Sequence, residues 1–332
     1  MIADLPDFRV KEAEPFSNVG LDFAGPLWIK SSHNEMVKCF ISLFTCCVTR
    51  AVHLELVEDM GVQTFIRCFK RFTARRGVPV LVVSDNAQTI KAMDRHLLKL
   101  YNHPEVRAEF EKKKVEWKFI LERPSHWAGF YERLVGSTKR CLKKVLGNAR
   151  LSYDEMHTML VEVECTLNAR PLTYVYNEVE LEVITPSHLL HGRNIKSLPD
   201  YPLEEEDYKD VDVGARYRYL TTKLAHYWSR WRNEYLVNLR EQHLNKSKPG
   251  SKFVQIGDIV LIGDDSKKRN QWRLGVVQEL VPGKDGEVRG AKVRVASKGK
   301  TSIWARPVQK LFPIEVQSEI EGRIEMLGDN HA

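Results

Sequence analysis

The segment VGLDF, residues 19–23, decides how the N-terminal part of this 332-residue chain folds. Alternate side chains of a strand point to opposite faces, which puts Val19, Leu21 and Phe23 on one face and Asp22 on the other. A carboxylate inside an apolar strand is costly unless it is paired or binds a metal ion. The segment therefore predicts a core strand in which Asp22 is a candidate functional residue.

Strand and helix patterns follow this segment in a mixed order. The predicted elements are strands over 16–29, 37–49 and 51–57, a helix over 61–76, a buried strand over 80–83, helical structure over 90–115 broken at His103-Pro104, a strand over 117–121, and helices over 126–146 and 153–169. The first three strands have short connections, which predict an antiparallel meander. The whole order predicts an α/β fold with a mixed sheet flanked by helices.

The C-terminal part has a different character. Residues 200–212 carry seven acids and one lysine, which predicts a solvated linker, and 217–239 predicts a basic, aromatic helix. From residue 253 onward, short strands separated by glycine turns predict a small all-β barrel. Residues 216–310 hold 21 Lys and Arg and 8 Asp and Glu, against a net charge of +7 for the chain. The basic excess predicts a polyanionic partner for this part.

The cysteines and histidines limit which classes of protein this chain can belong to. The six cysteines form no C-x-x-C pair and lie mostly in apolar segments, so we expect buried, reduced thiols in an intracellular protein. The eleven histidines complete no zinc-ligand pattern, so we expect no structural zinc. The N-terminal residues show no secretory signal, and the most apolar run is too short for a bilayer, so we expect no membrane association.

Two further acidic residues, Asp85 and Glu132, lie where catalytic or metal-binding side chains are commonly found. Asp85 ends the 80–83 strand, where α/β sheets place ligand-binding groups. Glu132 lies early in a helix, on the face that also carries Lys139 and Lys143. Carboxylates that converge at a sheet edge suit Mg²⁺ or Mn²⁺. Ordinary alternatives remain open: Asp22 capping a turn, Asp85 in a simple turn, and Glu132 paired with either lysine.

The sequence around the three acids carries a family resemblance. VGLDFAGPL holds Asp22, VSDNAQT holds Asp85 and WAGFYERLV holds Glu132. In this order the three segments resemble the catalytic motifs of the retroviral integrase superfamily, and most closely its BEL/Pao retrotransposon branch. The tail, from GDIVL at 257–261 to RPVQKL at 306–311, resembles the domain that follows the core in such elements. The resemblance runs from about residue 10 to 315.

The resemblance implies a domain plan. It consists of a connecting segment (1–14), an RNase H-like core with a mixed five-stranded sheet (15–198), an acidic linker (199–215), a basic aromatic helix (216–252), an SH3-like DNA-binding barrel (253–315) and a flexible tail (316–332). The superfamily's N-terminal zinc-binding domain is missing from this sequence, so we expect a fragment, a polyprotein piece, or a degraded or repurposed copy. Forty-six residues separate Asp85 from Glu132, more than in the retroviral pattern, and the surplus falls in the helical segment 90–115.

The resemblance also implies the reaction. Two Mg²⁺ or Mn²⁺ ions, roughly 3.5–4 Å apart, would activate the attacking oxygen and stabilise the leaving one. Asp22 would bridge both ions, Asp85 would hold one and Glu132 the other. Asn86 would support the site through a hydrogen bond. The implied reactions are 3′-end processing and DNA strand transfer, in the nucleus after import from the cytoplasm, by a homo-oligomer bound to element ends and target DNA.

Basic residues are candidates for contacts with DNA phosphates. They are Lys139 and Lys143 on the helix of Glu132, and Lys267, Lys268, Arg269, Arg273, Arg289, Lys292 and Arg294 in the barrel. We expect Tyr227, Trp228, Trp231 and Tyr235 to pack rather than to stack on bases, and Trp272 and Trp304 to pack rather than to form an aromatic cage. Two other functions stay open: a catalytically inactive domesticated DNA-binding scaffold, and an RNase H-like nuclease.

Overall fold

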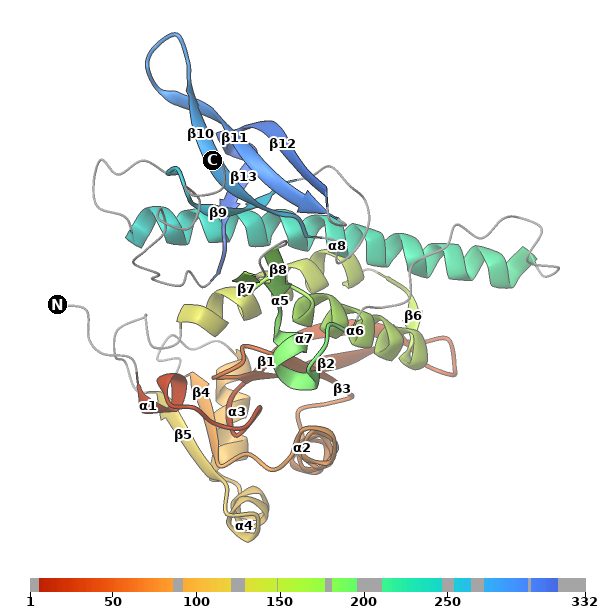
Figure 1. The fold of residues 1–332 in the computed structure, drawn as a ribbon. Helices are drawn as coiled ribbons and strands as arrows, with labels where there is room; N and C mark the ends of the chain where they lie inside the picture. Colours follow the sequence, from red (N-terminus) through yellow and green to blue (C-terminus); the bar gives the residue numbers. More distant parts are fainter. Residues whose placement is uncertain are drawn as a thin grey trace. The chain divides into compact units, whose positions relative to one another are not determined.

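The computed structural model describes residues 6–85, 92–120, 129–147, 149–176, 181–195, 211–246, 254–263, 272–297 and 300–315 (Figure 1). The chain forms two compact units. The first comprises residues 1–168 and 189–231, and the second comprises 169–188 and 232–332. This division differs from the core expected over 15–198, because the hairpin within 169–188 belongs to the second unit, where its strand β8 (Leu181–Ile184) contacts β10 (Leu274–Pro282).

A mixed sheet forms the centre of the first unit. Its strands are β1 (Asn18–Lys30), β2 (Met36–Cys46), β3 (Val52–Val57), β4 (Leu81–Asp85) and β5 (Glu116–Ile120), in the spatial order β3-β2-β1-β4-β5. The first three form the predicted antiparallel meander, and β4 runs parallel to both β1 and β5. The expected count of five strands is wrong by one. A sixth strand, β6 (Leu151–Ser152), pairs with the end of β1 and has only two residues, too few for a pattern of alternation.

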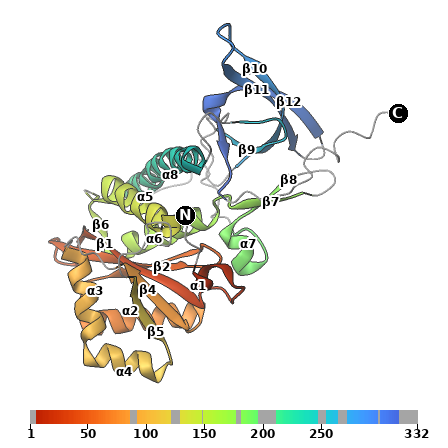
Figure 2. The ribbon, with the colours of Figure 1, turned by 90° about the vertical axis from the view of Figure 1, so that its left-hand side faces the viewer.

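Helices cover both faces of this sheet. Those that contact its strands are α2 (Val62–Arg76), α3 (Ala92–Asn102), α4 (Pro104–Lys112), α5 (Gly129–Leu146) and α6 (Tyr153–Asn168). Two short helices, α1 (Asp7–Val10) and α7 (Pro186–His191), precede β1 and follow β8 along the chain. Both views place α2 on one side of the sheet and α5 and α6 on the other (Figures 1 and 2). The helical segment between β4 and β5 breaks at His103, as predicted, because Pro104 begins α4 and lacks the N–H that would continue α3.

The face of β1 opposite Asp22 belongs to the aromatic core of the first unit. Val19, Leu21 and Phe23 are all buried there, which confirms the predicted alternation. The ring of Phe72 in α2 stacks on Phe44 of β2 with centroids 4.1 Å apart. All six cysteines carry free thiols, and all are buried except the partly exposed Cys165, in accord with the expected reduced thiols.

Helix α6 closes the outer edge of β3. The side chain of Asn168 accepts a hydrogen bond from Val52 N and donates one to Val52 O, both at 2.8 Å. Glu164 Oε2 accepts a hydrogen bond from Leu54 N at 2.8 Å. Side chains of α6 therefore take the backbone groups that a neighbouring strand would otherwise use, and the edge is protected from pairing with another chain.

Charged side chains from β3, α2 and α6 meet beneath this edge. This group, the β3 charge cluster, consists of His53, Glu55, Arg71, Arg75, Arg76 and Glu164. The side chain of Glu55 is only 2% exposed. Its carboxylate oxygens lie 3.1 Å from His53 Nε2, 2.7 Å from Arg71 Nε and 2.9 Å from Arg75 Nη1. Every buried charge in the cluster thus has a partner of opposite sign, the condition under which such charges are tolerated.

The β3 charge cluster should make stability depend on pH. Burial alone would lower the pKa of His53, but its hydrogen bonds to Glu164 and Glu55 outweigh burial and raise it above its ordinary 6.5. Burial alone would raise the pKa values of Glu55 and Glu164, but hydrogen bonds, first of all from His53, lower both below 4.5. The His53 contribution is complete below pH 6.5 and lost as pH rises through its folded pKa. The glutamate contributions are complete above pH 4.5 and lost as pH falls.

We therefore expect the cluster to stabilise the protein most between pH 4.5 and 6.5. Urea unfolding at pH 4, 5.5 and 8 measures this dependence. His53→Gln removes the titrating ring, so the decline in unfolding free energy between pH 5.5 and 8 should be smaller in this variant than in the wild type. An equal decline in both proteins would show that His53 does not cause it.

The second unit is built on an antiparallel sheet. Its strands are β9 (Ile259–Ile262), β10, β11 (Val288–Ser297), β12 (Lys300–Pro307) and β13 (Leu311–Pro313), in the order β12-β11-β10-β9-β13, with the 3₁₀-helix η2 (Val308–Lys310) before β13. Gly275 has no room for a side chain, because a Cβ there would lie 2.3 Å from Val293 Cγ1. A separate hairpin, β7 (Thr173–Tyr176) with β8, completes the described strands of this unit.

Helix α8 (Val211–Lys246) begins before the expected residue 216. Tyr227, Trp228, Trp231 and Tyr235 are all buried along it, which confirms that these rings pack. Within the first unit, Arg216 of α8 binds both carboxylate oxygens of Glu155 in α6 at 2.5 Å and donates to Arg150 O at 2.8 Å. These hydrogen bonds from Arg216 lower the pKa of Glu155 to about 2. Among the described helices, α8 included, none has the length and apolar character needed to cross a membrane.

Candidate active site

Strands β1 and β4 bring two of the predicted acids to one part of the sheet. The strands are parallel, and Gly20 of β1 is opposite Val83 of β4. Asp22 and Asp85 each lie two residues further along, so the register, if continued, brings their backbone positions opposite each other. Asp85 is the last residue of β4 and is paired with Ile120 of β5. Asn86, predicted to support the site, lies outside the described residues.

Helix α5 supplies the third position. Glu132 lies in its first turn, and Lys139 follows two turns later on the same face. Lys139 Nζ donates a hydrogen bond to Asp22 Oδ2 at 2.5 Å. This contact shows that the face of α5 carrying Lys139 is turned toward β1 at Asp22. The backbone position of Glu132 therefore belongs to the helix face that approaches Asp22, about 10 Å along the axis from Lys139.

The surroundings of Asp22 decide between its two predicted roles. Asp22 lies within the 13-residue strand β1 and caps no turn, so the turn-capping alternative is wrong. Its Oδ1 accepts a hydrogen bond from Phe23 N at 2.6 Å, and its Oδ2 accepts one from Lys139 Nζ. The side chain remains 25% exposed. Lys139 thus supplies the opposite charge that a carboxylate inside an apolar strand needs.

The Asp22 carboxylate is also a candidate ligand for a divalent cation, which would have to displace Lys139 from Oδ2. Carboxylate oxygens are the ligands that Mg²⁺ and Mn²⁺ prefer, and Asp22 offers Oδ2 toward the side of the sheet that α5 approaches. Within the described side chains, no three His, Cys, Asp or Glu residues form a metal-binding group, and those of Asp85 and Glu132 are not among them. Asp22, Asp85 and Glu132 stay the predicted ligands, and the structure gives their backbone positions on β1, β4 and α5.

The basic residues predicted to contact DNA have varied surroundings. Lys139 forms an ion pair with Asp22, a contact that the sequence did not indicate. Lys143, one turn further along α5, is exposed. On the β10–β11 hairpin, Arg289 pairs with Asp285 at 2.5 Å. Residues 267–269, which hold three of the predicted contacts, lie outside the described part.

Other predicted contacts lie on the strands of the second sheet. Lys292 pairs with Glu279 at 2.8 Å, and the partly exposed Arg294 lies opposite Ile303. The guanidinium of Arg273 lies 5.1 Å from the ring centroid of Trp304. Their positions are compatible with phosphate contacts, which stay a prediction for each of them.

Two tryptophans of the second unit have neighbours of different kinds. Trp304 packs against the core of the sheet, and Arg306 lies 4.6 Å from its ring centroid, in addition to Arg273. Trp272 meets Tyr235 edge to face at 5.8 Å. For Trp304 this confirms the expectation of packing over a cage, since arginine guanidinium groups already lie against its ring.

Comparisons with known proteins give a family match and structural likenesses. Residues 215–314 match the model of a family of unknown function, DUF5641. No curated protein matches the chain. A chain of the simian T-cell lymphotropic virus intasome in complex with PP2A regulatory subunit B56 gamma is similar with 12% identity and a TM-score of 0.38, over 94% of this chain and 83% of that one.

The catalytic core domain of HTLV-2 integrase, solved in complex with magnesium in a dimeric form, is similar over 54% of this chain and 98% of its own, with 16% identity and a TM-score of 0.35. Both TM-scores lie below 0.5.

Proposed function

We propose that the chain is a retroelement integrase of the BEL/Pao type, a divalent-metal-dependent DNA strand-transfer enzyme. The observation that carries this proposal is the Lys139–Asp22 contact. This contact supports an approach of the α5 face that bears Glu132 to β1, and the parallel pairing of Gly20 with Val83, continued by two residues, supports Asp22 and Asp85 as neighbours. Together the three motifs would supply the carboxylate site that phosphoryl transfer requires.

The chain's own residues would hold and orient the reacting groups. Asp22, Asp85 and Glu132 would bind Mg²⁺ or Mn²⁺, which when bound supplies Lewis-acid stabilisation of the oxygens at the scissile phosphate. The backbone N–H of Phe23 fixes the orientation of the Asp22 carboxylate. Lys139, once released from Asp22, would bind a neighbouring DNA phosphate, and Asn86 would support the site. These groups align a terminal hydroxyl or a water with the phosphodiester, which is where positioning lowers the barrier.

The second unit would bind DNA without reading its sequence. The order β12-β11-β10-β9-β13, with a 3₁₀ turn before the last strand, supports an SH3-like barrel. The excess of 21 basic over 8 acidic residues in 216–310 supports binding of a polyanion. The partners we propose are element ends and target DNA, bound by a homo-oligomer in the nucleus.

Strand transfer by the purified chain tests the proposal. The substrate is a branched DNA that mimics the joined product, supplied with Mg²⁺ or Mn²⁺, and the variant is Asp85→Asn. We expect metal-dependent joining that this variant loses. Salt-sensitive DNA binding without joining by the wild type would contradict the proposal and favour a DNA-binding scaffold. Cleavage of RNA–DNA hybrids without strand transfer would favour a nuclease.

A further inference from the structure

Strands β11 and β12 come from a stretch of sequence that contains no acid. Residues 288–314 include seven lysines and arginines and no aspartate or glutamate. Strand β12 pairs with β11 along its whole length, from Lys300 opposite Ser297 to Pro307 opposite Gly290. This part of the second sheet therefore concentrates positive charge, as a surface that binds a polyanion requires.

Two of these charges are already neutralised within the sheet. Arg289 pairs with Asp285 at 2.5 Å, and Lys292 pairs with Glu279 at 2.8 Å. Glu279 belongs to β10, and Asp285 lies in the turn that joins β10 to β11. A DNA phosphate would have to displace a carboxylate from each of these cations, which reduces the gain from binding there.

The basic side chains of β12 have no acidic partner of this kind. Lys300 and Arg306 lie near the two ends of the strand, about 20 Å apart at the usual rise per residue. No carboxylate within the described ranges pairs with either side chain, and Arg306 Nη1 donates to the neighbouring Ala305 O at 3.0 Å. Both charges are therefore available to a ligand without the loss of an ion pair.

Strand β12 also lies at one edge of its sheet. Among the described strands it is the first in the order β12-β11-β10-β9-β13, and six of its eight residues are exposed. An edge strand presents backbone N–H groups that no neighbouring strand takes, and the exposed hydroxyls of Thr301 and Ser302 lie beside them. Backbone N–H groups, hydroxyls, lysines and arginines are the donors with which proteins contact DNA phosphates.

Trp304 holds the cation at the Arg306 end of this edge. Lys300, Trp304 and Arg306 lie on one face of β12, because even numbers of residues separate them. The Trp304 ring packs against the core of the sheet, and the guanidinium of Arg306 lies 4.6 Å from its centroid. A guanidinium placed in advance by a ring loses less entropy when it binds a phosphate.

We propose that the exposed edge of β12, with Lys300 and Arg306 as its phosphate contacts, is the surface through which the second unit binds the DNA backbone. This inference rests on the proposed function, because it takes the polyanion to be duplex DNA. Arg289 and Lys292, which the sequence analysis selects as DNA contacts, would then contribute less than Lys300 and Arg306. The strand edge of a second copy is a less suitable ligand, because both copies would bring two cations and no acid to one interface.

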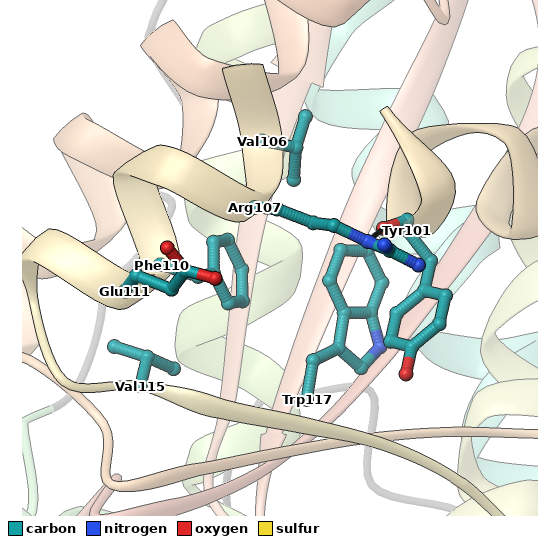
Figure 3. Close-up of a pocket in the computed structure, with 7 residues that line it drawn as sticks. All are labelled: Tyr101, Val106, Arg107, Phe110, Glu111, Val115 and Trp117. Atoms are coloured by element: carbon teal, nitrogen blue, oxygen red, sulfur yellow. Dashed lines mark hydrogen bonds between the residues drawn. The ribbon is translucent and has the colours of Figure 1, made fainter. Parts of the chain in front are cut away.

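The hollow beside α4 in the first unit suits DNA less well (Figure 3). Arg107 and Glu111 at its rim have opposite charges, so a phosphate bound by the arginine would lie within one helical turn of a carboxylate. Phe110 and Trp117 in its walls are 5% and 8% exposed and stack with centroids 5.1 Å apart. These rings belong to the core and offer no free face on which a base could stack.

The salt dependence of DNA binding tests the β12 proposal. The full chain is titrated, in EDTA and between about 50 and 300 mM KCl, against two fluorescent duplexes of unrelated sequence, each of about 30 base pairs. The logarithm of the affinity falls with the logarithm of the salt concentration, with a slope of about −0.9 for each phosphate contact. Lys300→Gln and Arg306→Gln should each reduce the slope by about 0.9 and weaken binding about fivefold at 0.15 M KCl, equally on both duplexes.

Lys284→Gln is the matched control, because it removes one exposed positive charge from the same unit, in the turn between β10 and β11. Its slope should stay close to that of the wild type. Equal losses in the control, or larger losses in Arg289→Gln and Lys292→Gln than in the β12 variants, would overturn the proposal. So would a loss on only one duplex, or an unchanged affinity for DNA together with a smaller oligomer in sedimentation velocity.

The same titration separates this proposal from the proposed function. Binding by the wild type that persists unchanged in Lys300→Gln and Arg306→Gln would refute the β12 contact alone. Absence of DNA binding by the wild type would refute the integrase function together with it. Because EDTA removes divalent ions, neither result depends on whether the three acids catalyse strand transfer.

Discussion

Replacing Glu55 by alanine is expected to lower the free energy of unfolding by about 3–5 kcal/mol. Glu55 is 2% exposed and lies at the centre of the β3 charge cluster, where it accepts from His53, Arg71 and Arg75. Its loss leaves a buried imidazole and two arginines without their common counter-charge, and it opens a cavity between β3 and α2. Both effects act in the same direction, since the loss of hydrogen bonds to a buried carboxylate and the opening of a void each cost roughly 1–3 kcal/mol, while His53 keeps its contact with Glu164.

Equilibrium denaturation in urea at pH 6 measures this loss. Glu116→Ala is the matched control, because Glu116 pairs with Lys118 at 2.9 Å while both side chains are 59% exposed. Water screens such a surface pair, so its removal should cost at most about 1 kcal/mol. A loss for Glu55→Ala no larger than that of the control would show that the cluster does not stabilise the fold.

Asp22→Asn is expected to reduce strand transfer by at least about a hundredfold while the fold is retained. A bound divalent ion contributes several kcal/mol to stabilising the transition state, and each 1.36 kcal/mol is worth a factor of ten in rate. The amide keeps an oxygen that can accept from Phe23 N, so β1 should be undisturbed. The lost ion pair with Lys139 joins side chains that are 25% and 31% exposed, so its effect on stability should be small.

Rates of joining on the branched substrate, with circular dichroism and urea unfolding alongside, measure both parts of this expectation. Glu35→Gln neutralises an exposed acid next to β2 and serves as the control, with activity near that of the wild type. Lys139→Gln should retain more activity than Asp22→Asn, because it removes a positioning and DNA-binding group but no metal ligand. Asp22→Asn with activity within threefold of the control would exclude this carboxylate from the chemistry.

Much of the first unit follows from periodicity in the sequence. The alternation around Asp22 predicts which side chains of β1 are buried, and Pro104 predicts the break between α3 and α4. Both signals are local, because they depend on the geometry of one strand and on one missing N–H. Asp22 is likewise predictable as a special residue, since a carboxylate inside an apolar strand needs a cationic partner or a metal ion to offset its desolvation.

Ion-pair partners that lie far apart along the chain cannot be predicted from local periodicity. His53 and Glu55 alternate with apolar residues in β3, which hints at a polar stripe, but Arg71, Arg75 and Glu164 come from other elements. The pairing of Lys139 with Asp22 spans 117 residues, and the local sequence offered only Glu132, on the same helix, as an alternative partner. Burial on both faces of β3 is a tertiary property, so periodicity identifies the strand without its ionic partners.

The tie between Arg216 and Glu155 bears on how this molecule can be divided. The match to DUF5641 starts at residue 215, yet the guanidinium at residue 216 has its acceptors, Glu155 and the carbonyl of Arg150, in the segment before that point. A fragment cut at residue 215 keeps the arginine and loses both acceptors, while the remaining core keeps Glu155 without the cation that lowers its pKa. The start of the family match at residue 215 therefore does not coincide with the boundary of a compact unit, because the first unit extends to residue 231. Substitutions on the two sides of residue 215 should constrain each other during evolution.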